Sequence, residues 1–363
     1  MKKTEVLIMQ LYMPTKVYSE KNCVQNHARE IQGTGKKAML ISGKTSARKT
    51  GALADVIQAL GETPYVLFDD IEENPSIETV MAARDLALQE GADFFIGIGG
   101  GSAMDAAKAI ALMAANPDRG EEVLYTPEKL SHLPVVCVPT TCGTGSEVTP
   151  YAILTIHARQ AKKSISHRIF PTLALMDAGY LRFLPRHILV NTCVDALCHL
   201  IESYLNTNSN DLNRVYSREG LRLWGQFKDR LLDDAVVESD YATMLHASML
   251  AGMAITHTGT SLPHGLSYAV TYHLGIPHGK ACGLFIGGYV DACKDSVDAA
   301  AVAALLGFDS TAQFRRYMAA LLGEVAVDPA LLHTAAEAIL ADPSKLKNCP
   351  YPVTKDLVLS MFL

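Results

Sequence analysis

The residues best suited to chemistry are the histidines of the stretch PHGLSYAVTYHLGIPHGKA, residues 263–281. A Pro-His-Gly unit stands at each end, which places His264 and His278 at a turn or at the beginning of a helix. Earlier in the chain, CVDALCHLIESY carries Asp195 and His199 four residues apart, so that on a helix both project from one face. These four side chains can bind one cation, and their donors suit Fe(II), Mn(II), Co(II) or Zn(II) without choosing among them. The alternative for any single histidine is an ordinary core or surface imidazole.

A glycine cluster predicts a second kind of site. FFIGIGGGSAMDAAKAIALMAA begins as an apolar strand, passes through the cluster Gly97–Gly101 and continues as a helix. Glycines let a backbone approach a ligand closely, and the free N–H groups at a helix start suit a diphosphate. We expect Ser102 to be the N-cap residue, with Asp105 completing a capping box. The run lacks the third glycine of G-x-G-x-x-G, so a tight turn without a ligand is the alternative.

A hydroxyl-rich loop follows another strand-like run. Residues 138–154, VPTTCGTGSEVTPYAIL, offer hydroxyl and backbone N–H groups directly after LPVVCV. Open α/β sheets bind ligands at the carboxyl ends of their strands, which favours a ligand here. The alternative is a capping turn without a ligand.

The order of the elements indicates how these segments are positioned. Runs such as KKAMLISG, PYVLFDD and LPVVCVPTT alternate with helical patterns, which is typical of β-α-β units around a parallel sheet. After about residue 180 the strand signal fades and helical patterns follow one another. A chain of 363 residues is long enough for two domains. We therefore predict an α/β domain over residues 1–180 and an all-helical domain over residues 181–363, whose first helix starts at Pro185.

Composition excludes several classes of protein. The net charge of −6 and the lack of a Lys/Arg cluster argue against nucleic acid as a partner. No window approaches the roughly 20 apolar residues of a membrane span. The first residues, MKKTEVLIMQLYMPTKVYS, contain a short apolar run broken by Gln10 and no small-residue cleavage site, so we interpret them as a first strand. Eight cysteines without a C-x-x-C pair indicate free thiols, and we expect a cytoplasmic protein.

Several motifs together resemble the iron-dependent, or group III, alcohol dehydrogenases. They are GGGSAMDAAKAIA, PTTCGTGSEVTPYAIL, DALCHLIESY, HGLSYAVTYHLGIPHGKA and NCPYPVTKDLVLSMF, in order through nearly the whole chain. The resemblance implies an N-terminal dinucleotide-binding (Rossmann-like) α/β domain, an all-α metal-binding domain, and a cleft between them for nicotinamide and substrate. It also implies that Asp195, His199, His264 and His278 hold the metal, which we expect to be Fe(II).

The resemblance also implies a set of cofactor-binding residues. It places the pyrophosphate on the glycine turn, lines the cleft with threonines and brings a lysine near the ribose. These residues are Gly99, Gly100, Gly101 and Ser102; Thr140, Thr141 and Thr144; and Lys163.

The choice between NAD(H) and NADP(H) depends on the residue after the second strand. Many NAD-using relatives carry an acidic residue there, whereas this chain has Gly43, followed by Lys44, Arg48 and Lys49. A carboxylate would repel a 2′-phosphate, and a glycine with nearby cations accepts one. We therefore expect NADP(H) in preference to NAD(H).

Proton transfer depends on the residue that lies one helical turn after His264. Several relatives have a histidine thought to help move the proton where this chain has Tyr268. Because an ordinary tyrosine pKa is about 10, the hydroxyl exchanges protons poorly at neutral pH. Tyr268 is then either a proton-relay residue or a wall of the pocket, with His273 or a cofactor ribose hydroxyl and water as alternative relays. Glu202 either orients His199 or lies on a solvated helix face.

The resemblance implies a metal-dependent oxidoreductase that interconverts small primary alcohols or diols and aldehydes with a nicotinamide cofactor. Alternatives on the same fold are a glycerol dehydrogenase and a cyclising lyase related to dehydroquinate synthase. A binding protein without catalysis is a third reading. We expect Phe285 or Leu266 to shape the substrate pocket. An N-terminal strand at a sheet edge predicts a homodimer.

Overall fold

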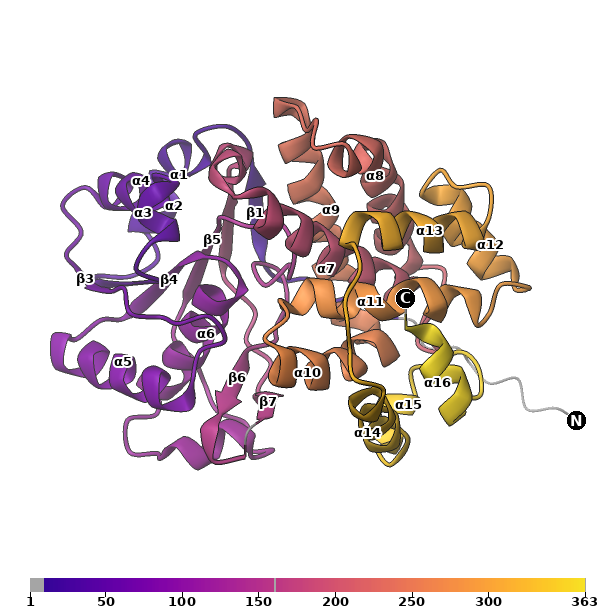
Figure 1. Ribbon diagram of the computed structural model, residues 1–363. Helices are drawn as coiled ribbons and strands as arrows, with labels where there is room; N and C mark the ends of the chain where they lie inside the picture. The colour runs from indigo at the N-terminus through magenta and orange to yellow at the C-terminus, as the bar shows by residue number, and fades with distance from the viewer. Residues whose placement is uncertain (1–9, 160, 363) are drawn as a thin grey trace, which may run out of the picture.

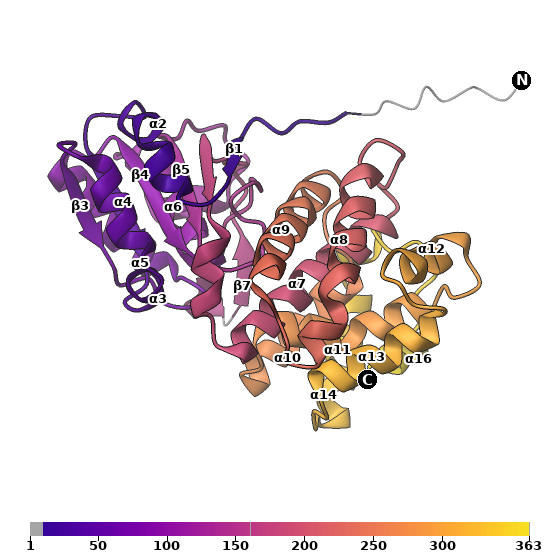
Figure 2. The same cartoon turned by 90° about the horizontal axis from the view of Figure 1, so that it is seen from above.

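The computed structural model describes residues 10–159 and 161–362, and the chain folds into two parts that lie side by side (Figures 1 and 2). The N-terminal part is a parallel sheet covered by helices, and the C-terminal part is helical. This confirms the predicted fold class.

Six parallel strands form the sheet, in the order β1-β8-β5-β4-β2-β3. Their bounds are Lys16–Ser19 (β1), Ala38–Ser42 (β2), Tyr65–Phe68 (β3), Phe94–Gly99 (β4), Val135–Pro139 (β5) and Leu173–Met176 (β8). The four inner strands are buried at every residue, as expected for a parallel sheet covered on both faces. A separate antiparallel hairpin joins β6 (Ile153–Ile156) to β7 (Ala161–Ser164).

Alternate side chains of each inner strand enter two different hydrophobic cores. On β2, Met39 and Ile41 pack on one face, and Leu40 packs on the other. Helices cover these two faces. They are α1 (Cys23–Asn26), α2 (Ala28–Gln32), α3 (Ser46–Lys49), α4 (Ala52–Leu60), α5 (Ile77–Glu90) and α6 (Gly101–Ala114).

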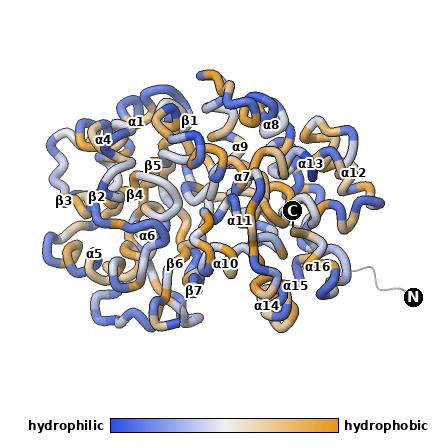
Figure 3. The backbone as a smooth tube through the Cα atoms, viewed as in Figure 1, coloured by the Kyte–Doolittle hydropathy of each residue, from blue (hydrophilic) through white to orange (hydrophobic). Residues whose placement is uncertain are grey.

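The C-terminal part surrounds one long central helix, α7 (Arg186–Tyr204), in which every residue from Cys193 to Tyr204 is buried. A helix that is buried all round serves as a core element. Buried hydrophobic residues form the cores of both parts, and hydrophobic stretches of the chain are orange in Figure 3. The other helices are α8 (Arg214–Leu232), α9 (Glu238–Thr258), α10 (Leu262–Leu274), α11 (His278–Asp291), α12 (Val297–Leu305), α13 (Thr311–Leu322), α14 (Pro329–Leu340), α15 (Pro343–Leu346) and α16 (Lys355–Met361).

The beginnings of two segments refine the prediction. The first strand is confined to Lys16–Ser19 at the end of the predicted stretch, residues 10–15 form no strand, and residues 1–9 lie outside the described residues. Pro185 is the N-cap residue of α7 and precedes its first turn.

Within the described ranges, no helix combines the length and apolar character needed to cross a bilayer. All eight cysteines are free.

Candidate metal and cofactor site

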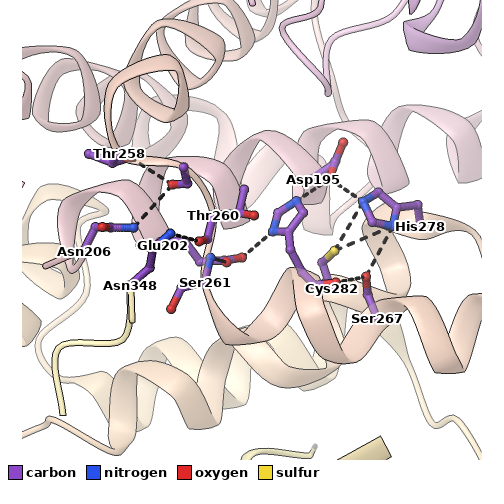
Figure 4. Close-up of polar contacts among 12 residues, drawn as sticks. Asp195, Glu202, Asn206, Thr258, Thr260, Ser261, Ser267, His278, Cys282 and Asn348 are labelled. Atoms are coloured by element: carbon purple, nitrogen blue, oxygen red, sulfur yellow. Dashed lines mark hydrogen bonds and ion pairs between the residues drawn. The ribbon is translucent and has the colours of Figure 1, made fainter. Parts of the chain in front are cut away.

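Four side chains from three helices converge in the C-terminal part. Asp195 comes from α7, His264 from the first turn of α10, and His278 and Cys282 from α11; one donor atom of each lies within 4.8 Å of the others. Asp195 Oδ1 lies 3.5 Å from His264 Nε2 and 3.8 Å from His278 Nε2. Cys282 Sγ lies 3.7 Å from His278 Nε2. Figure 4 shows Asp195, His278 and Cys282 pointing toward one another.

The second Pro-His-Gly unit explains how α11 reaches α7. Pro277 is the N-cap residue of α11, so His278 is its first helical residue. A Cβ atom on Gly279 would lie 1.9 Å from the carbonyl oxygen of Asn191, in α7. Only glycine permits this approach, which brings His278 to Asp195.

Two atoms of this cluster are buried without a hydrogen bond. Asp195 and His264 are each 4% exposed, and neither Asp195 Oδ1 nor His264 Nε2 has a hydrogen-bond partner. Leaving buried polar atoms unpaired is costly, so such atoms facing one another call for an explanation. A bound cation supplies one, because it accepts lone pairs from all the converging donors.

The charges in the cluster support one another. Burial alone would raise the pKa of Asp195, but the imidazoles of His199, His264 and His278 outweigh it and hold that pKa well below its usual range. Burial likewise opposes the Cys282 thiolate, yet His264 and His278 lower the pKa of Cys282 to about 7. The cluster thus favours an ionised carboxylate and a thiol that is easily ionised.

His199 lies beside this cluster without belonging to the set of four. It follows Asp195 by one helical turn, and its ring stacks on His264 with centroids 4.4 Å apart. Its Nδ1 atom is buried and unpartnered. Burial lowers the pKa of His199 to about 3, so the imidazole is neutral at physiological pH, as a metal ligand must be. His199 therefore stays a predicted ligand.

Glu202 orients His264, and neither of the two roles predicted for it holds. The carboxylate is fully buried, and its Oε1 atom lies 2.5 Å from His264 Nδ1. Its other oxygen accepts the backbone N–H of Ser261, at the N-cap of α10. A carboxylate on Nδ1 directs Nε2 of His264 toward Asp195, which is the usual arrangement around metal-bound histidines.

Replacing Glu202 by glutamine tests this orienting role. Glutamine keeps the shape but removes the charge, so we expect metal affinity to fall by about 10- to 100-fold. A titration against a competing chelator measures the change. Glu219→Gln, on the exposed face of α8, serves as the control because Glu219 pairs only with its neighbour Arg222 among the described residues. Unchanged affinity in Glu202→Gln would contradict the assignment.

The remaining predicted pocket residues divide into two groups. The Tyr268 ring lies parallel to the His278 ring, with centroids 5.8 Å apart, and burial raises its pKa above the ordinary value. His273 is exposed in the last turn of α10 and contacts Tyr272. Phe285 and Leu266 are fully buried in the core of the helical part, so they pack the core and do not line an open pocket.

The two segments predicted to bind cofactor lie against each other. β4 ends at Gly99, whose carbonyl oxygen accepts the Thr140 N–H at 2.8 Å, and α6 begins at Gly101. A Cβ on Gly100 would lie 3.2 Å from Thr141 Oγ1. A Cβ on Gly101 would lie 2.7 Å from Thr144 Cγ2. Glycine is therefore needed where the threonine loop, residues 140–149, crosses the turn.

The predicted capping box is wrong. Gly100, not Ser102, is the N-cap residue of α6, and no side chain caps it. Ser102 lies inside the helix, where its Oγ atom accepts the N–H of Asn74. Asp105 instead accepts hydrogen bonds from Ser146 Oγ at 2.5 Å and from the Ile153 N–H at 2.9 Å.

A buried lysine completes the connection between α6 and the threonine loop. Lys108 is fully buried, and its Nζ atom donates to Ser146 Oγ at 2.7 Å and to the Tyr151 carbonyl at 2.8 Å. Asp105 lies 3.6 Å away and balances its charge. The glycine turn and the threonine loop are thus held as one unit.

Lys163 and its neighbour Lys162 point to opposite sides of β7. Lys163 is exposed, with Nζ 5.1 Å from the ring centre of Tyr125. Lys162 is partly buried; burial lowers its pKa, and Glu73 and Cys282 act in the opposite direction. Its charge therefore lies within electrostatic reach of the metal cluster, and both views place the hairpin on the side facing α10 (Figures 1 and 2). Sequence reasoning missed Lys162.

The segment after β2 carries exposed ion pairs. Gly43 follows β2, and a Cβ there would lie 3.1 Å from the Ile71 carbonyl oxygen. Lys44 pairs with Asp70 at 2.7 Å, and Arg48 pairs with Asp69 at 2.6 Å. Exposed pairs of this kind contribute little free energy, so either cation is available to a phosphate.

The threonine loop also joins the two parts of the molecule. A Cβ on Gly145, whose φ is +61°, would lie 2.6 Å from the Cα of Gly252 in α9. Cys142 Sγ lies 3.7 Å from the Sγ atom of Cys193, two residues before Asp195 in α7. The threonine loop therefore packs directly on α9 and α7, the second of which carries Asp195.

Comparisons with known proteins agree with this arrangement. Residues 14–178 match the model of the iron-containing alcohol dehydrogenases, and residues 189–337 match the C-terminal model of that family. A crystal structure of an iron-containing alcohol dehydrogenase from Thermotoga maritima superposes with a TM-score of 0.89, at 35% identity over 98% of each chain.

Two curated relatives match over a shorter length. A mitochondrial hydroxyacid-oxoacid transhydrogenase of Caenorhabditis briggsae is 35% identical over 67% of this chain and 58% of its own. Alcohol dehydrogenase 4 of Schizosaccharomyces pombe is 31% identical over 74% of this chain and 64% of its own. The chain thus spans about three fifths of the length of these relatives. With both family models matched in order, the chain belongs to the iron-containing alcohol dehydrogenase family.

Proposed function

We propose that the protein is a metal-dependent oxidoreductase that interconverts small primary alcohols or diols and aldehydes with a nicotinamide cofactor. The observation that carries the proposal is the pair of buried, unpartnered atoms Asp195 Oδ1 and His264 Nε2, facing each other beside a cofactor loop. Family membership supports it as well.

Asp195, His199, His264 and His278 are the proposed metal ligands, and Fe(II) is the proposed metal. When bound, the metal supplies a Lewis acid and the nicotinamide supplies the hydride chemistry. The protein positions the two reactants: Glu202 fixes His264, and Gly279 lets α11 approach Asp195.

The proposed cofactor is NADP(H). The turn Gly99–Gly101 and the start of α6 would hold the pyrophosphate, because the first N–H groups of α6 have no partners within the helix. The threonine loop would line the cleft. Gly43 leaves room for a 2′-phosphate, and Lys44 and Arg48 would exchange their exposed carboxylate partners for it.

Proton exchange is proposed to run through a cofactor ribose hydroxyl and water. Burial raises the pKa of Tyr268, so its hydroxyl stays protonated and serves to donate a hydrogen bond. His273 is exposed in the last turn of α10 and is not one of the converging donors. Tyr268 then forms a wall of the pocket through its contact with His278.

We also propose a cytoplasmic homodimer. β1 is an edge strand of the sheet and is available for pairing with the same strand of a second copy. Eight free cysteines fit a reducing compartment. Light scattering of the purified protein measures the oligomeric state directly.

An anaerobic assay tests the proposed activity. Protein stripped of metal and reloaded with Fe(II) is mixed with propionaldehyde and either NADPH or NADH, and the reduced nicotinamide absorbance is followed. We expect oxidation of NADPH that requires the metal. Oxidation of NADH alone would refute the cofactor proposal and leave the chemistry in place.

If no small aldehyde consumes either cofactor, the proposed activity is wrong. A glycerol dehydrogenase would then reduce NAD(P) with glycerol, whereas a cyclising lyase would show no net cofactor turnover. Exchange between a hydroxyacid and an oxoacid without added cofactor would instead match the name of the Caenorhabditis relative.

A further inference from the structure

We propose that the Sγ atom of Cys282 is a ligand of the metal and takes the fourth position in place of His199. Asp195, His264, His278 and Cys282 then form one donor set of one oxygen, two nitrogens and one sulfur. This inference rests on the metal centre of the proposed function. It adds a ligand type that the carboxylate and imidazoles do not provide.

The separations between donor atoms fit a shared tetrahedral ion. Bond lengths of about 2.0–2.1 Å to nitrogen or oxygen and about 2.3 Å to sulfur imply separations of about 3.6 Å for N···S and about 3.3 Å for N···O. Cys282 Sγ lies 3.7 Å from His278 Nε2, and the two N···O separations to Asp195 Oδ1 are 3.5 and 3.8 Å. Small side-chain shifts therefore suffice to bind one ion.

The contacts of the Cys282 thiol differ from those of other cysteines in the chain. Cys23 and Cys293 donate their thiol hydrogens to backbone carbonyls, as buried thiols of no chemical role often do. Cys282 is fully buried, and its Sγ atom contacts the His278 imidazole. It lies one turn after His278 on α11, so both side chains face the same point.

A thiolate ligand changes the charge and the softness of the site. A divalent ion with Asp195 alone as anionic ligand leaves a net charge near +1, and the thiolate brings it to zero. Sulfur donors favour Zn(II) and Co(II) over Mn(II), for which oxygen donors are better. Cys282→Ser should therefore weaken Zn(II) binding by a larger factor than Mn(II) binding.

Cobalt substitution gives a direct readout that does not depend on activity. The metal-free protein is titrated with Co(II) alone, and its absorbance is recorded from the near ultraviolet through the visible. Visible d–d bands report that Co(II) is bound, and a near-ultraviolet thiolate-to-cobalt charge-transfer band reports a sulfur ligand. We expect both in the wild-type protein, and loss of only the charge-transfer band in Cys282→Ser and Cys282→Ala.

Cys198→Ser is the matched control, because Cys198 is also fully buried and lies next to His199, outside the four-donor set. It should keep the charge-transfer band. Cadmium-113 NMR of the wild-type protein reports a sulfur ligand without any substitution, in case the Cys282 variants do not fold.

The outcomes separate this inference from the proposed function. Visible bands without the charge-transfer band, or a band that persists in Cys282→Ser or disappears in Cys198→Ser, would overturn the role of Cys282 and leave the metal centre in place. If the wild-type protein binds no Co(II), the metal centre of the proposed function fails, and the inference with it.

Discussion

Asp195→Asn is expected to abolish metal retention and turnover together. Asparagine preserves the shape of the side chain but removes the charge that faces His264 Nε2 and His278 Nε2. Because the removed group is a proposed direct ligand, the loss of metal affinity should exceed the roughly 100-fold upper range seen for residues that only orient ligands. Metal content after dialysis against a chelator, measured beside aldehyde reduction, tests this.

Asp309→Asn provides the control, because Asp309 is exposed and distant in sequence from every proposed ligand. His199→Ala should also lose metal and turnover if this third imidazole is a ligand. Normal metal content with normal turnover in Asp195→Asn would refute the metal centre. The same result in His199→Ala would remove only His199 from the ligand set.

Glu147→Gln is expected to stabilise the protein at alkaline pH and to have no effect at acid pH. Glu147 is buried in the threonine loop, and its Oε1 atom has no hydrogen-bond partner. Burial raises its pKa from 4.5 to about 7, even though its own backbone N–H and Lys108 oppose the shift. The folded protein therefore holds this proton more tightly than the unfolded chain does.

The sign and the size of the effect follow from that difference. The stability due to the bound proton is complete below pH 4.5 and is lost as the pH rises through about 7. Glutamine resembles the protonated acid at every pH. The free energy of unfolding of Glu147→Gln should thus exceed that of the wild type by about 3 kcal/mol at pH 8 and match it at pH 4.5.

Urea denaturation of the metal-free proteins across this pH range measures the difference, and the metal-free form avoids the pH dependence of metal binding. Glu62→Gln, at an exposed position, should show no such trend. If the difference in the free energy of unfolding is constant with pH, or is largest at acid pH, then burial does not raise the pKa of Glu147 and the prediction is wrong.

Local sequence patterns predicted the helical positions of the site well. Spacing of four residues correctly placed Asp195 and His199 on one face of α7. The same spacing joins His278 to Cys282, so the pattern also places this cysteine on the face of α11 that carries His278, although a search for histidine ligands alone does not reveal it. Which residues share a face of one helix follows from the helical repeat alone and can be predicted without knowing the fold.

Contacts between elements were harder to predict. Glu202 lies on the same helix as His199, yet it binds His264, and only the packing of α10 against α7 determines that choice. On β7, Lys162 and Lys163 differ by one residue, which reverses the side of the strand that each occupies. The beginning of α6 was misplaced because the threonine loop binds Asp105, so Asp105 is not free to cap the helix.

The contact between Gly145 and Gly252 restricts how this protein can be altered, by design or by evolution. A Cβ on Gly252 would lie 2.6 Å from the Gly145 carbonyl oxygen, and a Cβ on Gly145 would lie equally close to the Gly252 Cα. The backbone of each glycine therefore leaves no room for a Cβ atom on the other. No single substitution at either position removes this steric clash. Libraries that vary the threonine loop should hold these two positions fixed and draw their diversity from the threonines around them.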